Sequence, residues 1–233
     1  MQRESISSAE TVAVWDLPTR LFHWSLALLI VLAWVSRHYG SGLTWHTWNG
    51  YAILILVVWR MLWGFVGSST SRFASFFYGP AAVLAYMRDF ALRRPRHFLG
   101  HNPLGALAVY GLLGLVALMG ILGLFAYNDD DAVGGPLSGR VLDKTATAAG
   151  HWHHQLFDVL QVLIVVHLAA QVVYFFWKRE NLPRAMVTGE KPADRYEDEQ
   201  AARIAGTGRA FLCLVIAAAI VFGGIVGAGG KLV

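Results

Sequence analysis

The sequence predicts an all-α membrane protein, a four-helix transmembrane bundle with a fifth transmembrane helix near its C-terminus. Two observations support this fold class. Hydrophobic residues make up 56% of the 233 residues and charged residues only 15%, whereas ordinary globular chains carry about a quarter charged residues. The apolar residues also gather in five long stretches. Because lipid offers no hydrogen-bond partners to the backbone, such stretches must be helices.

Each of the five stretches approaches or exceeds the ~20 residues that cross a bilayer as a helix. They run from about Leu21 to Ser36 (with Leu17 and Pro18 able to extend the first), Trp45 to Phe65, Pro103 to Tyr127, His151 to Trp177, and Ala210 to Gly229. The first stretch lacks a convincing signal-peptide cleavage site and contains His23, so we interpret it as a retained helix.

The connections between these stretches also carry predictions. The segment from Arg72 to Leu99 mixes aromatic and apolar residues and predicts a short interfacial helix. The segment from Lys178 to Arg209 is polar and predicts partial order against one face of the bundle. We expect two units, residues 1–192 as the bundle and 193–233 as a linker with the fifth helix. The nine tryptophans lie mostly near segment ends and predict interfacial belts.

The distribution of basic residues predicts the orientation. Fifteen Lys and Arg fall on the side of the N-terminal segment and four on the other side, which also carries the acidic run Asp129–Asp131. Because basic residues are retained in the cytoplasm, we expect a bacterial inner-membrane protein with a cytoplasmic N-terminus and a periplasmic C-terminus. Topology and anionic lipid thus account for the net charge of +4, and no nucleic acid is required.

Histidines recur on one face of the fourth stretch. His153 and His167 are 14 residues apart, about 1400° around a helix and within about 40° of four full turns, with a rise of about 21 Å. By the same geometry His154 and His151 point to other faces. Polar residues at membrane depth are costly and usually functional. The fourth helix therefore predicts two imidazole sites at two depths.

Two further histidines match these depths. His23 lies in the first turn of the first helix, on the side of His167, and His46 lies at the start of the second helix, on the side of His153. Two bis-imidazole sites can hold two haems by their axial positions. Interfacial caps and hydrogen-bonded core histidines are the structural alternative. Direct ligation of zinc or copper is a third, although two imidazoles per site do not favour tetrahedral zinc.

Small residues and the single cysteine limit the chemistry further. Gly50 follows His46 by four residues, and the third stretch is rich in glycine, which is compatible either with room for a macrocycle or with close helix packing. Cys213 is the only cysteine, so a disulfide scaffold, an iron–sulfur cluster and a covalently attached haem are excluded. No catalytic nucleophile motif or dinucleotide fingerprint is present.

Four motifs resemble those of one known family. They are the stretch Val14 to Trp24, the stretch His46 to Gly67, His101 to Gly105, and Trp152-His153 with His167 followed by Asn181 to Gly189. Together they are similar to the bacterial cytochrome b561 family, which includes the b-type cytochrome subunits of nickel–iron hydrogenases. The resemblance covers about residues 12 to 192, and residues 193 to 233 depart from the four-helix core of that family.

The resemblance implies two non-covalent b haems with His23 and His167 as axial ligands on the cytoplasmic side and His46 and His153 on the periplasmic side. It implies electron transfer between a membrane quinone, either ubiquinone or menaquinone, and a periplasmic hydrogenase, dehydrogenase or c-type cytochrome. Some relatives instead act alone as superoxide oxidases that reduce ubiquinone. A transporter or purely structural subunit is a third hypothesis, and an oligomer is compatible with the sequence.

Several polar residues are candidates for roles around these cofactors. A quinone needs an apolar slot with a few polar groups. The candidates for it are Arg60, His101, Asp158 and Gln161. Haem propionates pair with basic side chains. The candidates for these are Arg20, Arg60 and Lys178.

Overall fold

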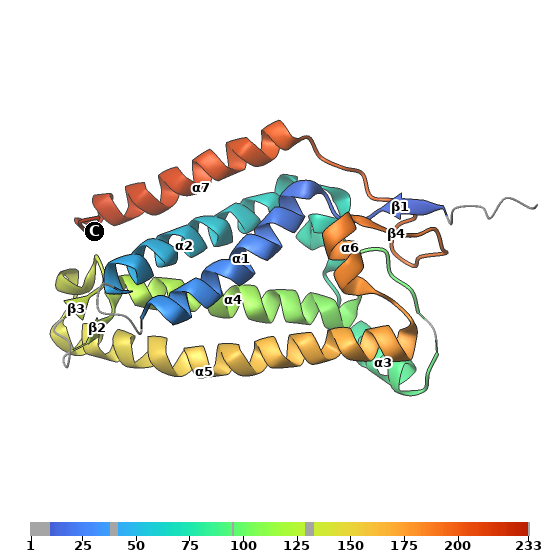
Figure 1. The fold of residues 1–233 in the computed structure, drawn as a ribbon, viewed down its shortest axis with the longest axis horizontal. Coiled ribbons are helices and arrows are strands. Elements are labelled where there is room, and N and C mark those ends of the chain that lie inside the picture. Colours follow the sequence, from blue (N-terminus) through green and yellow to red (C-terminus); the bar gives the residue numbers. More distant parts are fainter. Residues whose placement is uncertain (1–9, 38–41, 95, 129–132, 233) are drawn as a thin grey trace, which may run out of the picture.

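Five long helices run side by side in the computed structural model, which describes residues 10–37, 42–94, 96–128 and 133–232 (Figure 1). They are α1 (Leu17–Ser36), α2 (Gly42–Val66), α4 (Pro103–Phe125), α5 (Asp143–Val173) and α7 (Thr207–Gly227). A π-helical turn, η4 (Tyr174–Lys178), continues α5. By length and composition, five of the described helices can cross a membrane. The predicted fold class is confirmed.

Short elements close both ends of the bundle. What we call the basic end carries the 3-10 turns η1 (Ser69–Ser71) and η2 (Phe73–Phe76), the helices α3 (Pro80–Ala91) and α6 (Leu182–Thr188), and the antiparallel pair β1 (Thr11–Ala13) and β4 (Glu190–Pro192). The hairpin end carries the antiparallel pair β2 (Tyr127–Asn128) and β3 (Val133–Gly134) and the 3-10 turn η3 (Ser138–Arg140). A short helix is expected between residues 72 and 99, and α3 confirms it.

Side-chain caps begin two of the spanning helices at the basic end. The carboxylate of Asp16 accepts a hydrogen bond from the Thr19 N–H at 2.6 Å, and Pro18 occupies the first turn of α1. Asn102 caps α4 in the same way, accepting from the Gly105 N–H at 2.9 Å. Such caps pair donors that a helix start leaves unsatisfied. The first helix therefore includes the expected extension to residue 17.

Two expected boundaries at the hairpin end are wrong. The third helix ends at Phe125, and Tyr127 belongs to strand β2. The fourth helix begins at Asp143, eight residues before His151. Small residues explain the early start, because Gly150 lets the backbone pass so close to β2 that a Cβ there would lie 2.5 Å from the Tyr127 carbonyl oxygen. Counting apolar residues alone underestimates the length of a helix whose first turns are made of small and polar residues.

The fifth helix packs along α2 (Figure 1). Trp59 and Trp63 are buried in the seam with Cys213 and Ala217. The indole N–H of Trp59 donates to the Ala210 carbonyl at 2.9 Å, and that of Trp63 donates to a carboxylate oxygen of Asp16 at 3.3 Å. The predicted interfacial belt is therefore wrong for these two tryptophans, which are core residues.

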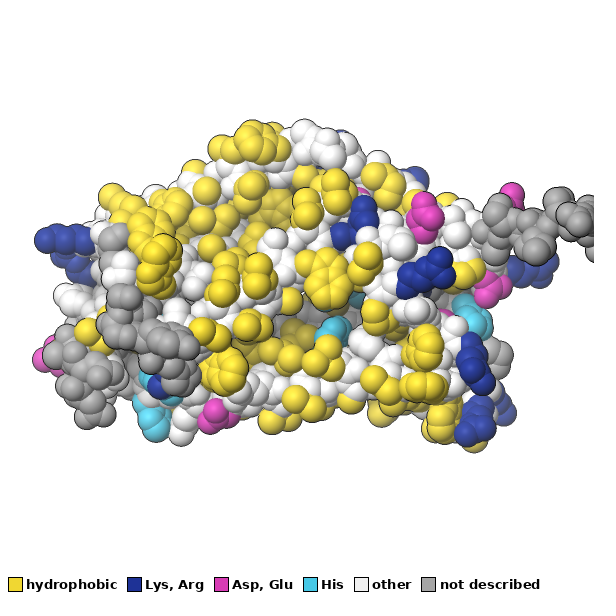
Figure 2. All heavy atoms as spheres, in the orientation of Figure 1, with side chains coloured by type: hydrophobic (Ala, Val, Ile, Leu, Met, Phe, Trp, Pro, Cys, Tyr) yellow, Lys and Arg dark blue, Asp and Glu magenta, His cyan; other side chains and the backbone are white. Residues whose placement is uncertain are grey.

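The segment after α6 is ordered against the basic end, as the sequence predicts. The Ala202 N–H donates to the carbonyl of Ala13 at 2.9 Å. The carboxylate of Asp198 accepts from the backbone N–H groups of Leu99 and Gly100 at 2.6 and 2.9 Å. Hydrophobic side chains cover the middle of the molecule, and Lys and Arg gather at its ends, mostly the basic end (Figure 2). The acidic run Asp129–Asp131 lies outside the described residues.

Candidate functional site

One histidine pair lies near the hairpin end, between α2 and α5. The ring centroids of His46 and His153 are 6.0 Å apart. Nδ1 of His46 lies 2.8 Å from the Ala33 carbonyl oxygen, and Nδ1 of His153 lies 2.9 Å from that of Met119. Since a carbonyl only accepts, each Nδ1 carries the hydrogen. This tautomer leaves both Nε2 lone pairs available to a metal.

A cavity of about 660 Å³ surrounds this pair. Its lining is mostly apolar and includes Ile30, Trp34, Ile53, Val116, Phe157 and Leu160 in addition to both histidines. Gly50 lines it as well, and a Cβ there would meet nothing within 4 Å. Gly123 gives room to the imidazole, because a Cβ there would lie 3.2 Å from Cε1 of His153. Gly50 therefore leaves open space in the cavity, whereas Gly120 allows close helix packing against Leu54.

The second pair lies toward the basic end, between α1 and α5. The ring centroids of His23 and His167 are 6.4 Å apart. Trp24 packs edge-on against His23 with centroids 4.9 Å apart. Nδ1 of His23 is buried and has no hydrogen-bond partner among the described residues. In Figure 2 the face between α1 and α5 is hollowed, and a histidine side chain lies at the edge of the hollow.

The separations within both pairs fit a shared metal ion. An imidazole nitrogen lies about 2.0–2.1 Å from a bound metal and about 1 Å from its ring centre, so two imidazoles on opposite sides of one metal have centroids roughly 6 Å apart. The observed 6.0 and 6.4 Å match this spacing. Among the described residues, no group of three or more His, Cys, Asp or Glu could hold a metal ion. Each pair by itself offers two imidazoles at a spacing that suits one metal ion.

Arg37 and His154 also border the hairpin-end cavity, and neither is among the predicted site residues. An Nη atom of Arg37 lies 2.9 Å from Nδ1 of His154, and both residues line the cavity. The sequence predicts that His154 lies on another face of α5 than His153, and the cavity is wide enough to reach that face as well. The sequence signal for this part of the cavity is Arg37, a basic residue directly after the first helix.

Arg60 and His101, two of the predicted quinone residues, lie at the basic end among aromatic rings. The guanidinium of Arg60 is 4.8 Å from the centroid of Phe73, and one of its Nη atoms is buried without a partner among the described residues. His101 packs between Trp15 and Phe76, with ring centroids 4.7 and 4.5 Å away. Its Nδ1 likewise has no partner in the described part of the chain.

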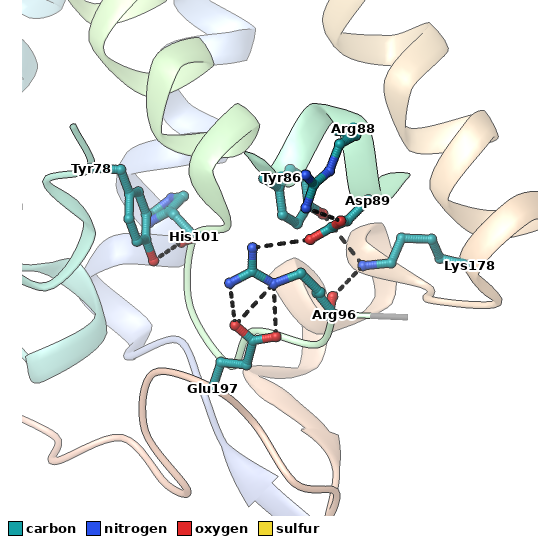
Figure 3. Close-up of polar contacts among 8 residues, drawn as sticks. All are labelled: Tyr78, Tyr86, Arg88, Asp89, Arg96, His101, Lys178 and Glu197. Carbon is teal, nitrogen blue, oxygen red and sulfur yellow. Dashed lines mark hydrogen bonds and ion pairs between the residues drawn. The ribbon is translucent and has the colours of Figure 1, made fainter. Parts of the chain in front are cut away.

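Burial also controls the charge of His101. Burial, together with the nearby positive charges of Arg60 and Lys191, lowers the pKa of His101 to about 3. The imidazole is therefore neutral at physiological pH. Tyr78 donates its hydroxyl to the His101 carbonyl at 2.9 Å and fixes the backbone there (Figure 3).

The remaining predicted residues do not gather at one site. Asp158 and Gln161 are exposed on α5. Arg20 donates to the carbonyl of Val187. Lys178 donates to the carbonyl of Arg96 at 2.6 Å and pairs with Glu180 at 3.2 Å. Both basic side chains are therefore committed to the packing of the basic end.

Comparison with known proteins agrees with the arrangement of the site. Residues 14–189 match the family model described as prokaryotic cytochrome b561. The chain is 27% identical over 220 residues to a probable Ni/Fe-hydrogenase B-type cytochrome subunit of Azotobacter vinelandii, covering 80% of this chain and 91% of the relative. A protein of the same description from Bradyrhizobium diazoefficiens is 28% identical over 214 residues, covering 78% of this chain and 86% of the relative. The matched region contains all four paired histidines, and the chain belongs to the prokaryotic cytochrome b561 family of b-type membrane cytochromes.

Proposed function

We propose that this protein binds two b haems and transfers electrons across the bacterial inner membrane between quinone and a periplasmic redox partner. One haem would lie between His46 and His153 and the other between His23 and His167. The observation that carries this proposal is the pair of imidazole sites, with ring centroids 6.0 and 6.4 Å apart, that share α5 at two depths. A haem supplies an iron that alternates between ferrous and ferric states.

The chain contributes ligands, orientation and an apolar surround. At the hairpin end, two backbone carbonyls hold the Nδ1–H groups, so both rings present Nε2 toward their shared space. Neutral imidazole adds no buried charge. A histidine from each of two helices would hold the haem at each site, an arrangement suited to electron transfer. The mostly apolar lining near His153 would pack against the bound cofactor.

The basic end would face the cytoplasm and the hairpin end the periplasm. Most of the Lys and Arg lie at the basic end or in its connections (Figure 2), as the retention of basic loops in the cytoplasm requires. The C-terminus would then lie in the periplasm. Residues 1–192 would form the haem-binding unit, and residues 193–233 would add a cytoplasmic linker and α7. The family match, which ends at residue 189, supports this division.

The partners follow from the relatives and from the basic end. The relatives are named as hydrogenase subunits, so a periplasmic hydrogenase is the first candidate, ahead of a dehydrogenase or a c-type cytochrome. Ubiquinone or menaquinone would be reduced or oxidised at the basic end. Arg60 and His101 support a quinone site there, because each has a buried nitrogen without a partner beside aromatic rings. A quinone carbonyl oxygen can accept a hydrogen bond from the Arg60 N–H, and the hydroxyl of the reduced quinol can donate one to Nδ1 of neutral His101.

Haem stoichiometry tests the ligand assignment. Wild-type protein should carry two haems per chain and show a strong α-band when reduced. His153→Ala should lose one haem. His151→Ala is the matched control, since His151 is exposed two positions earlier on the same helix, and should retain both. Unchanged haem content in His153→Ala would refute the assignment.

A second candidate function is favoured by the position of Arg37. Its guanidinium lies at the hairpin-end cavity beside His154, where positive charge would attract an anion. This supports a superoxide oxidase that passes the electron of superoxide to ubiquinone and releases dioxygen. Stopped-flow mixing with superoxide should then reduce the haem faster in wild type than in Arg37→Gln. Haem reduction no faster than the spontaneous rate would remove this candidate.

A further inference from the structure

A second cavity lies at the corner where α3 and η4 meet, away from both histidine pairs. It is open to solvent, has a volume of about 410 Å³ including its open part, and is lined by Phe90, Arg93, Arg94, His97, Trp177 and Lys178. Two of these six side chains are aromatic and four carry basic groups. We call it the α3–η4 pocket. It belongs to neither the haem sites nor the Arg60 and His101 cluster.

The backbone at this pocket places an arginine where glycine is usual. Arg93 follows the end of α3 with φ of 55°, in the left-handed region. Its N–H donates to the Phe90 carbonyl at 3.1 Å, and the N–H of Arg94 donates to that of Asp89 at 2.9 Å. This double hydrogen bond is the helix-ending motif whose left-handed position normally holds glycine. Strained residues that persist often mark functional sites.

The strained arginine is held over an aromatic ring. The guanidinium carbon of Arg93 lies 4.1 Å from the ring centroid of Trp177, a favourable cation–π geometry. Among the described residues only Arg93 and Arg179 combine a positive φ with a side chain, and Arg179 ends η4 on the other side of the same corner. The fold therefore fixes the guanidinium of Arg93 at the mouth of the pocket.

The acidic side chains near the pocket are already paired with other basic groups. Glu180 lies 3.1 Å from Nδ1 of His97 and 3.2 Å from Nζ of Lys178. Glu197 pairs with Arg96 at 2.6 Å, and Asp89 lies 3.6 Å from the same guanidinium (Figure 3).

Two basic residues of the pocket are left without an acid. Arg93 and Arg94 are exposed and form no ion pair within the described part of the chain. The pocket therefore carries two uncompensated guanidinium groups beside two aromatic rings. That combination fits an anion with an apolar portion.

The surroundings of the pocket indicate a lipid rather than a free anion. Leu84 and Met87 are exposed on α3, Leu92 follows it, and Phe176 is exposed beside Trp177. An inorganic phosphate would gain nothing from these apolar side chains, whereas acyl chains would cover them. Basic pockets between helices at the cytoplasmic side of a membrane suit anionic head groups. Arginine also recognises phosphate oxygens in a bidentate manner.

We infer that the α3–η4 pocket binds the phosphodiester head group of an anionic phospholipid, with Arg93 and Arg94 on the phosphate and the acyl chains over α3. Phe90 and Trp177 would line the region below the head group. This inference is independent of haem binding and of the redox partner. In this proposal α3 is an interfacial helix that a bound phospholipid stabilises.

Lipid-dependent thermal unfolding of the full chain in neutral detergent tests the inference. Phosphatidylglycerol should raise the unfolding temperature of wild type, whereas phosphatidylcholine and inorganic phosphate should leave it unchanged. In the double variant Arg93→Gln/Arg94→Gln, half-saturation should need about 30-fold more phosphatidylglycerol, since each specific arginine–phosphate contact in the pocket contributes roughly a fivefold gain. Arg93→Gly, which keeps the left-handed turn, should need about fivefold more phosphatidylglycerol without losing the fold.

The control is the double variant Arg184→Gln/Arg195→Gln, which removes two exposed charges at the same end of the molecule but away from the pocket. It should bind phosphatidylglycerol within about twofold of wild type, because neither side chain lines the pocket that would hold the head group. Equal losses in both double variants would overturn the inference. Stabilisation by inorganic phosphate as large as that by phosphatidylglycerol would overturn the lipid assignment.

Discussion

The two histidine pairs of the bundle differ in how the chain holds their rings. At the hairpin end, the carbonyls of Ala33 and Met119 fix His46 and His153, and a cavity of about 660 Å³ surrounds them. At the basic end, Nδ1 of His23 is buried without a partner among the described residues. Backbone carbonyls therefore fix the orientation of both rings at the hairpin end. At the basic end, no described residue fixes Nδ1 of His23 in this way.

The same difference should separate the reduction potentials of the two proposed haems. A hydrogen bond from Nδ1–H to a carbonyl makes imidazole a stronger donor, which favours ferric iron and lowers the potential. The many Lys and Arg at the basic end favour the reduced state there. We expect the hairpin-end haem to have the lower potential, so that electrons run downhill from the hairpin end to the basic end.

Removing one ligand from each pair has the largest expected effect. His46→Ala should abolish the lower-potential wave in a redox titration of the α-band, and His23→Ala should abolish the higher one, each with loss of half the haem. The cause is the loss of one of two axial ligands at that site. Loss of the same wave in both variants, or the reverse order, would contradict the comparison.

Filling the hairpin-end cavity should have the next largest effect. Gly50→Leu places a side chain into space where a Cβ meets nothing within 4 Å. Haem occupancy at that end should fall about tenfold, because forcing a side chain into an occupied site costs roughly 1–3 kcal/mol. Gly223→Leu, on α7 with equally open surroundings, is the control and should keep both haems. A normal lower-potential wave in Gly50→Leu would show that no ring lies against Gly50.

Low pH should lower the free energy of unfolding through protonation of His101. Its folded-state pKa of about 3 lies below the ordinary 6.5 because of burial. Between these values the unfolded chain binds a proton that the folded chain does not, so the free energy of unfolding falls as pH drops from 6.5 toward 3. Thermal unfolding of His101→Leu should depend less on pH over this window. The exposed-site control His151→Leu should follow wild type, and identical pH profiles for all three proteins would contradict the burial of His101.

The smallest expected effect comes from the exposed pair at the surface of the basic end. A double-mutant cycle on Arg96→Gln and Glu197→Gln should give a coupling of about 0.2–1 kcal/mol, because solvent screens such pairs. The hydrogen bonds from Arg96 lower the pKa of Glu197, so the coupling is present above the ordinary glutamate pKa and is lost as pH falls below it. A coupling unchanged at acidic pH would contradict this account.

The sequence predicted the spanning helices better than their ends. Hydropathy predicts a helix wherever lipid contact is favourable, so all five spans were found. Hydropathy does not detect the small residues Ala146, Ala149 and Gly150, which extend α5 toward β2. Trp63 shows the same limit. A tryptophan near a segment end predicts an interface, yet its burial depends on α7, which is more than 140 residues away in sequence.

The sequence alone determined the membrane fold, the family, and the shared face of His153 and His167, because hydropathy and helical period are local properties of the chain. The tertiary structure decided what surrounds those rings. The Ala33 and Met119 carbonyls, the Arg37 contact with His154 and the Arg93 contact with Trp177 each join residues from different elements. Such contacts depend on how helices pack against one another, which no local pattern records.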